Sequence, residues 1–119
     1  HFAGAVLVPD SVSDPLSYYL NNTVRARALI EAAVRGGVPH FIFSSTSAVY
    51  GTPAVMPVDE DAPLKPESPY GRSKLMVEMM LADPHGMHAD TVGYEIRYII
   101  GSKHLVYDIA SFANCSCVK

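Results

Sequence analysis

The sequence lacks the features that would place it in a membrane or on nucleic acid. It has no run of about 18 apolar residues, so no transmembrane helix is predicted. Its formal net charge is −3, whereas nucleic-acid-binding proteins usually present a basic face. Charged residues make up only 18% of the chain and hydrophobic residues 49%, which argues against disorder and predicts one domain with a buried core.

Cysteine is also scarce. The two cysteines, Cys115 and Cys117, are separated by one residue, and a disulfide across so short a span is strained. Two thiols are too few for a structural zinc site, so we expect reduced thiols in a cytoplasmic protein and no metal. The first residues have no methionine and do not read as a signal peptide, so we expect an internal segment of a longer protein.

Two segments predict helices. Asp14-Pro15 begins the first, which continues to Arg35 without Gly or Pro and ends at Gly36-Gly37. Ser68-Pro69 begins the second, which spans residues 70–82. In the first helix we expect one apolar stripe to pack against a sheet. It is formed by Leu16, Leu20, Val24, Ala28 and Ala32 and is widened by Ile30, Ala33 and Val34.

Short apolar segments predict the strands. Residues 40–44 and 92–99 are rich in aromatic and β-branched residues, which favours two buried parallel strands separated by the second helix. The first of these strands runs into a series of hydroxyl residues from Ser44 to Ser47, at the strand end where α/β proteins place their chemistry. By pattern alone, residues 5–8 also form a short strand.

Tyr70 and Lys74 are four residues apart in the second predicted helix, so their side chains share one face. A phenol has a pKa of about 10 and is a poor base at neutral pH, but a nearby ammonium group favours the phenolate. The phenolate can take a proton from a sugar hydroxyl while hydride leaves the same carbon. Thr46, after the preceding strand, adds a hydroxyl that can orient the sugar. Taken alone, the Tyr–Lys pair is also typical of an ordinary surface helix.

The pattern extends well beyond this pair. It includes HFAG at 1–4, DPLSYYLNNT at 14–23, FIFSSTSAVYG at 41–51 and SPYGRSKLMVE at 68–78. In order and spacing these segments resemble the extended short-chain dehydrogenase/reductase family of NAD-dependent epimerases and dehydratases. Within that family they are most similar to the nucleotide-sugar 4-epimerases that interconvert UDP-glucose and UDP-galactose.

The resemblance implies a partial Rossmann-like, doubly wound parallel α/β sheet, with NAD as cofactor and a nucleotide sugar as substrate. In such enzymes the sugar C4 hydroxyl is oxidised and hydride then returns to the other face of the sugar. By resemblance, Tyr70 is the general base, Lys74 its electrostatic partner and a cofactor ligand, and Thr46 a substrate-contacting hydroxyl. The residues expected to line the cofactor are Phe2, Ala3, Gly4, Asn21, Tyr70 and Lys74. The resemblance also makes residues 5–13 a loop, an expectation we prefer to the strand.

The sequence departs from this family in four places. The glycine-rich G-x-x-G-x-x-G turn, whose backbone amides hold the pyrophosphate, is absent. Val6 stands where many epimerases have a cofactor-side lysine, and Ile99-Ile100 replace a Phe-Asn that helps to bind the nucleotide sugar. Residues 101–119 match nothing in the family. We therefore expect residues 1–100 to form a partial NAD-binding domain without its first βαβ unit or the C-terminal substrate region, followed by a divergent tail.

Two other interpretations stay open. One is a non-catalytic fragment or binding module that has kept the pattern. The other is a nucleotide-sugar dehydratase, although these enzymes place Asp-Glu after the hydroxyl residue, where this chain has Ser47-Ala48. The partners expected are a nucleotide sugar and a second copy of the chain, packed through helices 15–35 and 70–82, with neither nucleic acid nor membrane.

Overall fold

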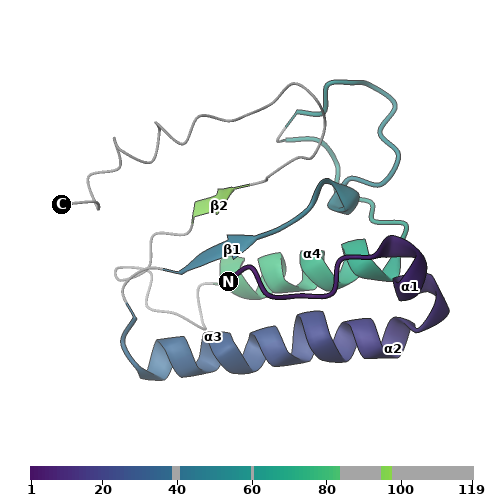
Figure 1. The fold of residues 1–119 in the computed structure, drawn as a ribbon. Helices are drawn as coiled ribbons and strands as arrows, with labels where there is room; N and C mark the ends of the chain where they lie inside the picture. The colour runs from purple at the N-terminus through teal and green to yellow at the C-terminus, as the bar shows by residue number, and fades with distance from the viewer. Residues whose placement is uncertain (39–40, 60, 84–94, 98–119) are drawn as a thin grey trace.

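The computed structural model describes residues 1–38, 41–59, 61–83 and 95–97 (Figure 1). The predicted tail at 101–119, with both cysteines, lies outside these ranges, as does the Ile99-Ile100 pair. The elements in chain order are α1 (Val8–Ser13), α2 (Pro15–Tyr18), the π-helical η1 (Tyr19–Val24), α3 (Arg25–Arg35), β1 (Ile42–Ser44), the 3-10 turn η2 (Ser47–Val49), α4 (Pro69–Ala82) and β2 (Glu95–Arg97). In the described part, no helix is long and apolar enough to cross a bilayer.

The sheet is parallel. Strands β1 and β2 pair with Phe43 opposite Ile96, which confirms the predicted parallel strands near 40–44 and 92–99. On the other edge of β1, the Ser44 N–H donates to the His1 carbonyl at 3.2 Å, and the His1 amino group donates to the Ile42 carbonyl. Backbone groups of successive residues point to opposite edges of a strand. Ile42 and Ser44 face His1, so the N-terminal residues lie beside β1 on the side away from β2.

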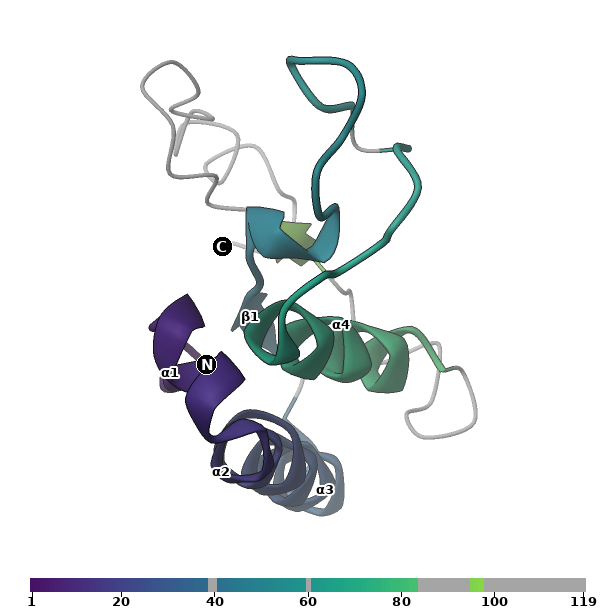
Figure 2. The ribbon, with the colours of Figure 1, turned by 90° about the vertical axis from the view of Figure 1, so that its right-hand side faces the viewer.

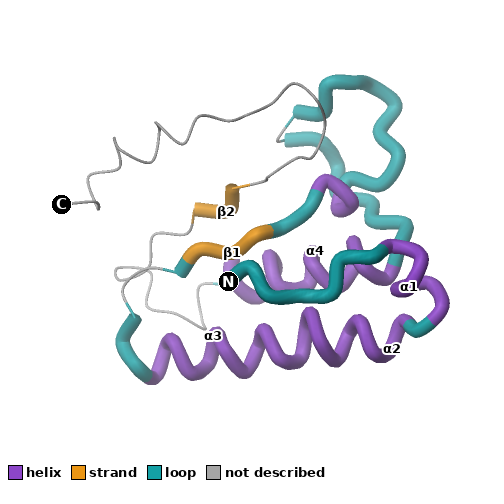
Figure 3. Tube along the Cα trace, viewed as in Figure 1, coloured by secondary structure: helices purple, strands orange, loops and turns teal. Residues whose placement is uncertain are grey.

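Both long helices pack on one face of this sheet. Elements α2, η1 and α3 continue from Pro15 to Arg35, and α4 lies alongside them beneath β1 (Figures 1 and 2). The predicted helix starts are confirmed, because Asp14 accepts a side-chain cap bond from the Ser17 N–H and Ser68 accepts one from the Gly71 N–H. Between η2 and α4 the described residues, 50–59 and 61–68, form a loop (Figure 3).

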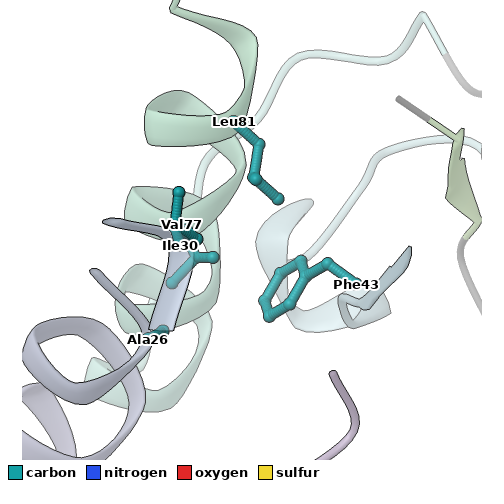
Figure 4. Close-up of a cluster of buried hydrophobic side chains, with 5 residues drawn as sticks. All are labelled: Ala26, Ile30, Phe43, Val77 and Leu81. Atoms are coloured by element: carbon teal, nitrogen blue, oxygen red, sulfur yellow. The ribbon is translucent and has the colours of Figure 1, made fainter. Parts of the chain in front are cut away.

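The hydrophobic core forms where the two helices meet the strand. Phe43 points from β1 toward the helices and is enclosed by small and branched side chains of α3 and α4 (Figure 4). The buried cluster consists of Ala26, Ile30, Phe43, Val77 and Leu81. The side chain of Ala26 is only a methyl group, so α3 can pack closely against α4 and β1 at that position.

The predicted stripe of the first helix is wrong for its five main residues, whereas Ile30 and Ala33, which were expected to widen it, are buried. Leu16 is 77% exposed, Leu20 51% and Val24 54%, and Ala28 and Ala32 are exposed as well. The buried face is instead formed by Tyr18, Asn22, Ala26, Ile30 and Ala33. The helix has two faces with apolar residues, and the one richer in large aliphatic side chains points away from the sheet.

Residues 5–13 fit the expected loop only in part. Residues 5–7 have no regular secondary structure, which agrees with the loop and not with the strand, but Val8–Ser13 form the helix α1. Pro9 occupies the first turn of this helix, where its missing N–H costs nothing. The Ser11 side chain is buried and donates to the Val8 carbonyl at 2.6 Å, which closes the turn on itself.

Replacing Leu81 with Ala is expected to lower the free energy of unfolding by about 2–5 kcal/mol, because it removes a fully buried side chain from the helix–strand core. Urea unfolding followed by circular dichroism measures this loss. Met79→Ala is the control, since Met79 is largely exposed on the same helix and its truncation should change stability by about 0.5 kcal/mol or less. Equal losses in the two variants would contradict the assigned core.

Candidate active site

The candidate site lies where the chain leaves the carboxyl end of β1. Thr46 follows the strand in an extended conformation, with φ −156° and ψ 147°. Its hydroxyl accepts a hydrogen bond from the Ala48 N–H at 3.2 Å and so begins the turn η2. This bond fixes the Thr46 hydroxyl just after the strand end, and the residue is half-buried.

Tyr70 lies in the first turn of α4, and its side chain is buried. Tyr18 packs edge-on against its ring, with the ring centroids 6.4 Å apart. The Tyr18 hydroxyl in turn donates to the Leu7 carbonyl at 2.7 Å. The first predicted helix and the N-terminal segment therefore both help to fix the position of the Tyr70 ring.

Lys74 lies one helical turn after Tyr70 and is only 4% exposed. Its Nζ donates to the Ser44 carbonyl at 2.9 Å and lies 4.8 Å from the centre of the Phe43 ring, within range of a cation–π interaction. Burial lowers the pKa of Lys74 from its usual value of 10.5, and the charge of Glu78 acts in the opposite direction. The ammonium group is thus directed at the strand end and not into bulk water.

Gly71 allows α4 to approach this strand end so closely. A Cβ at this position would lie 2.6 Å from the Ala48 carbonyl oxygen and 3.1 Å from the Pro66 side chain. No side chain larger than hydrogen fits there unless the backbone moves. The glycine between Tyr70 and the rest of the helix therefore brings the Thr46 turn and the Tyr70–Lys74 face of α4 together.

The predicted cofactor-lining residues lie at the same edge of the sheet. Phe2 and Ala3 are exposed, and Gly4 is half-buried with its Cβ position 3.5 Å from the Lys74 Nζ. Asn21 lies on η1, where its side chain accepts from Arg25 at 2.8 Å and donates to Asn22 at 3.3 Å. The roles of these residues toward a cofactor stay predictions.

Sequence reasoning missed Asn22, which is only 3% exposed. Its side-chain oxygen accepts from the Ala5 N–H at 2.8 Å, and its amide donates to the Ala5 carbonyl at 2.9 Å and to the Ser73 hydroxyl at 3.2 Å. Ser73 also donates to the Tyr70 carbonyl at 2.7 Å. Asn22 thus ties the segment after Gly4 to α4, and its four-residue spacing from Tyr18 and Ala26 was the signal that could have identified it.

The structure places Tyr70 and the buried Lys74 one turn apart on α4, with Lys74 bound to the end of β1, two residues before Thr46. Within the described ranges, no three His, Cys, Asp or Glu side chains are grouped so that they could hold a metal ion. A phenol, an ammonium group and a hydroxyl can transfer protons and orient hydroxyl groups. These features define the class: an α/β protein with a polar site at the carboxyl end of a parallel sheet, where such proteins bind nucleotides.

The chain belongs to the NAD dependent epimerase/dehydratase family, whose model matches residues 1–102. Among known proteins it is similar to a UDP-glucose 4-epimerase of Azospirillum brasilense, with 52% identity over 88 residues that make up 74% of this chain and 25% of that protein. The chain thus spans about a quarter of the length of the curated relatives it matches. The expected family is confirmed.

Solved structures agree with this assignment. A UDP-Glc/GlcNAc 4-epimerase from Campylobacter jejuni superposes with a TM-score of 0.73 at 45% identity, over 84% of this chain and 29% of that chain. A UDP-glucose 4-epimerase from Brucella ovis, in complex with NAD, superposes with a TM-score of 0.69 at 39% identity, over the same shares of the two chains. The likeness extends from the sequence to the arrangement of the elements.

Gly71→Ala is expected to destabilise the chain by about 1–3 kcal/mol, although the same change in an open helix stabilises it by roughly 1 kcal/mol. The added methyl group would overlap the Ala48 backbone and push η2 away from α4. Urea unfolding measures the loss, and amide chemical shifts should change around Thr46. The exposed neighbour Arg72→Ala serves as control and should cost less than about 1 kcal/mol. A stabilised Gly71→Ala variant would contradict the close contact.

Proposed function

We propose that this chain carries the catalytic residues of an NAD-dependent nucleotide-sugar 4-epimerase that interconverts UDP-glucose and UDP-galactose. The observation that carries the proposal is the buried Lys74 ammonium group, held at the strand end one helical turn from Tyr70 and beside the turn that begins at Thr46. The relatives named UDP-glucose 4-epimerase support the choice of reaction and of sugar nucleotide.

The residues present fit a nicotinamide cofactor. Phe2 and Ala3 are exposed, and Gly4 has little room for a side chain, since a Cβ there would lie 3.1 Å from the Asn22 Oδ1 and 3.5 Å from the Lys74 Nζ. We infer that the Phe2–Gly4 segment, Asn21 and Lys74 hold NAD, with the Lys74 ammonium group available to ribose hydroxyls. When bound, NAD supplies the chemistry of accepting hydride from the sugar and returning it.

The chain's own residues would carry out the proton transfers. Tyr70 takes the proton from the sugar C4 hydroxyl as general base and gives it back when the configuration has been inverted. Lys74 supports it, because a positive charge held close by stabilises the phenolate that forms. Thr46 donates to or accepts from the sugar hydroxyl and keeps it aligned with Tyr70. Burial of Lys74 strengthens its effect, since water does not screen a charge inside the protein.

The residues after Thr46 support epimerisation over dehydration. Dehydratases of the family place an acid pair there to remove water from the sugar, whereas this chain has Ser47 and Ala48. Both residues belong to η2, and the Ala48 carbonyl lies against the first turn of α4. A carboxylate cannot be supplied from these two positions, so elimination of water has no acid or base there.

Tyr70→Phe is expected to lower the rate of epimerisation by about 10²–10⁴-fold, because it removes the general base. The test uses a chimera in which the 88 aligned residues of this chain replace the matching segment of the A. brasilense enzyme. Tyr19→Phe is the matched control and should retain full activity, since no role at the site is assigned to Tyr19. Unchanged epimerisation in the Tyr70 variant would end the proposal, and release of a 4-keto-6-deoxy sugar by the chimera would assign dehydration.

We further propose that the chain pairs with a second copy of itself through the two long helices. The exposed aliphatic stripe of Leu16, Leu20 and Val24 lies on the first of them. It continues toward α4 at Met76, whose sulfur lies 4.0 Å from the Thr23 hydroxyl and whose side chain is also exposed. Packing of this patch against the same patch on a second copy would remove large apolar side chains from water.

Leu20→Glu is expected to shift the chain from dimer to monomer, because it places a carboxylate in the centre of this stripe. Sedimentation velocity at micromolar concentrations measures the change. Leu29→Glu is the control: Leu29 has similar exposure but lies off the stripe, so this variant should remain dimeric. A chain that is monomeric before any substitution would refute the pairing.

A further inference from the structure

Helix α4 buries a second charged residue beside its catalytic face. Glu78 lies one turn after Lys74 and is 5% exposed, against 4% for Lys74. Removing one charge from water is costly, and removing two is tolerated only when the charges compensate each other and their hydrogen bonds are made. None of the proposed roles of Tyr70, Lys74 or Thr46 uses Glu78.

Both charged groups are anchored to consecutive residues at the end of β1. The Lys74 Nζ donates to the Ser44 carbonyl at 2.9 Å. The hydroxyl of Ser45, itself buried, donates to the Glu78 carboxylate. Two buried side chains, one helical turn apart on α4, thus reach two consecutive residues, the last of β1 and the one that follows it.

Some of the groups near Lys74 stabilise its charged form, and others destabilise it. The amino group of His1, beside β1, carries the same sign and is repelled by Lys74, while Tyr70 precedes it by one turn. The Phe43 ring offers a weak cation–π attraction. Burial lowers the pKa of Lys74, and the Glu78 carboxylate is the charge that raises it.

We propose that Glu78 is a positioning residue: its buried carboxylate, fixed by Ser45, compensates the charge of the buried Lys74 ammonium group one helical turn away and holds that group at the strand end. The Ser45 hydroxyl fixes the carboxylate, the carboxylate offsets the desolvation of the ammonium group, and the ammonium group stays charged next to Tyr70. The part concerning Tyr70 rests on the proposed epimerase function, whereas the coupling of Glu78 to Lys74 does not.

The coupling predicts how Lys74 titrates. Glu78→Gln keeps the shape and the hydrogen-bonding oxygen but removes the negative charge. Glu78 then no longer offsets the effect of burial on the Lys74 pKa. Lys74 should therefore lose its proton at a lower pH than in the unsubstituted chain. Under the proposed function Lys74 acts in its charged form, so the variant would also lose activity at a lower alkaline pH than the unsubstituted site.

The experiment is an NMR titration of the ¹³Cε and ¹Hε signals of Lys74 in the 119-residue chain. The midpoint for Lys74 in Glu78→Gln should move to lower pH, while the exposed Lys65 in the same sample should not move. The matched control is Glu67→Gln, which removes an exposed carboxylate by the same isosteric change and should leave the Lys74 midpoint in place. An unchanged or raised midpoint in Glu78→Gln would overturn the proposal.

A second measurement covers the case in which Glu78→Gln does not fold. Lys74→Met leaves the Glu78 carboxylate buried without its ammonium partner, so the double variant with Glu78→Gln should be more stable to urea than Lys74→Met alone. A double variant that is no more stable than Lys74→Met would show that the two charges are not coupled. Neither measurement needs epimerase activity, so their failure is distinguishable from failure of the Tyr70→Phe test.

Discussion

The close contact between the start of α4 and the end of β1 is the constraint on which the rest of the structure depends. Gly71 permits it, because any Cβ there would meet the Ala48 carbonyl. Ser68 caps the helix at this point, and the Lys74 side chain reaches across to the Ser44 carbonyl. If this contact opened, the phenol, the ammonium group and the strand-end hydroxyl would no longer share one site.

The same contact explains why the domain tolerates buried charge. Lys74 and Glu78 bring both signs into the interior, which costs stability that apolar side chains would not cost. The serines at the strand end satisfy both groups, one through its backbone and the other through its hydroxyl. A buried charge acts more strongly on a neighbouring group than a surface charge does, because water screens it less. The stability lost by burying Lys74 would therefore serve the proposed activity.

The helix from Pro15 to Arg35 has two faces with different roles, one buried against the sheet and one exposed. Its inner face combines an aromatic ring, a buried amide and small residues, and through Tyr18 and Asn22 it supports Tyr70 and the segment after Gly4. Its outer face carries exposed leucine and valine side chains that no described element covers. The helix therefore positions the site from within, and it presents the apolar surface on which we place a second copy.

The sequence by itself determined the local elements and the chemical composition of the site. Capping residues, prolines and glycines bound the two long helices, short apolar runs predicted the parallel strands, and the Tyr70–Lys74 spacing identified one helical face, since these signals act between near neighbours in the chain. Only the tertiary structure decided which face of the first helix is buried, that Val8–Ser13 is helical, that Asn22 and Gly71 connect distant segments, and that Glu78 is buried. Each of these depends on contacts between segments far apart in the sequence, and periodicity along a single helix cannot say which of two apolar faces meets the sheet.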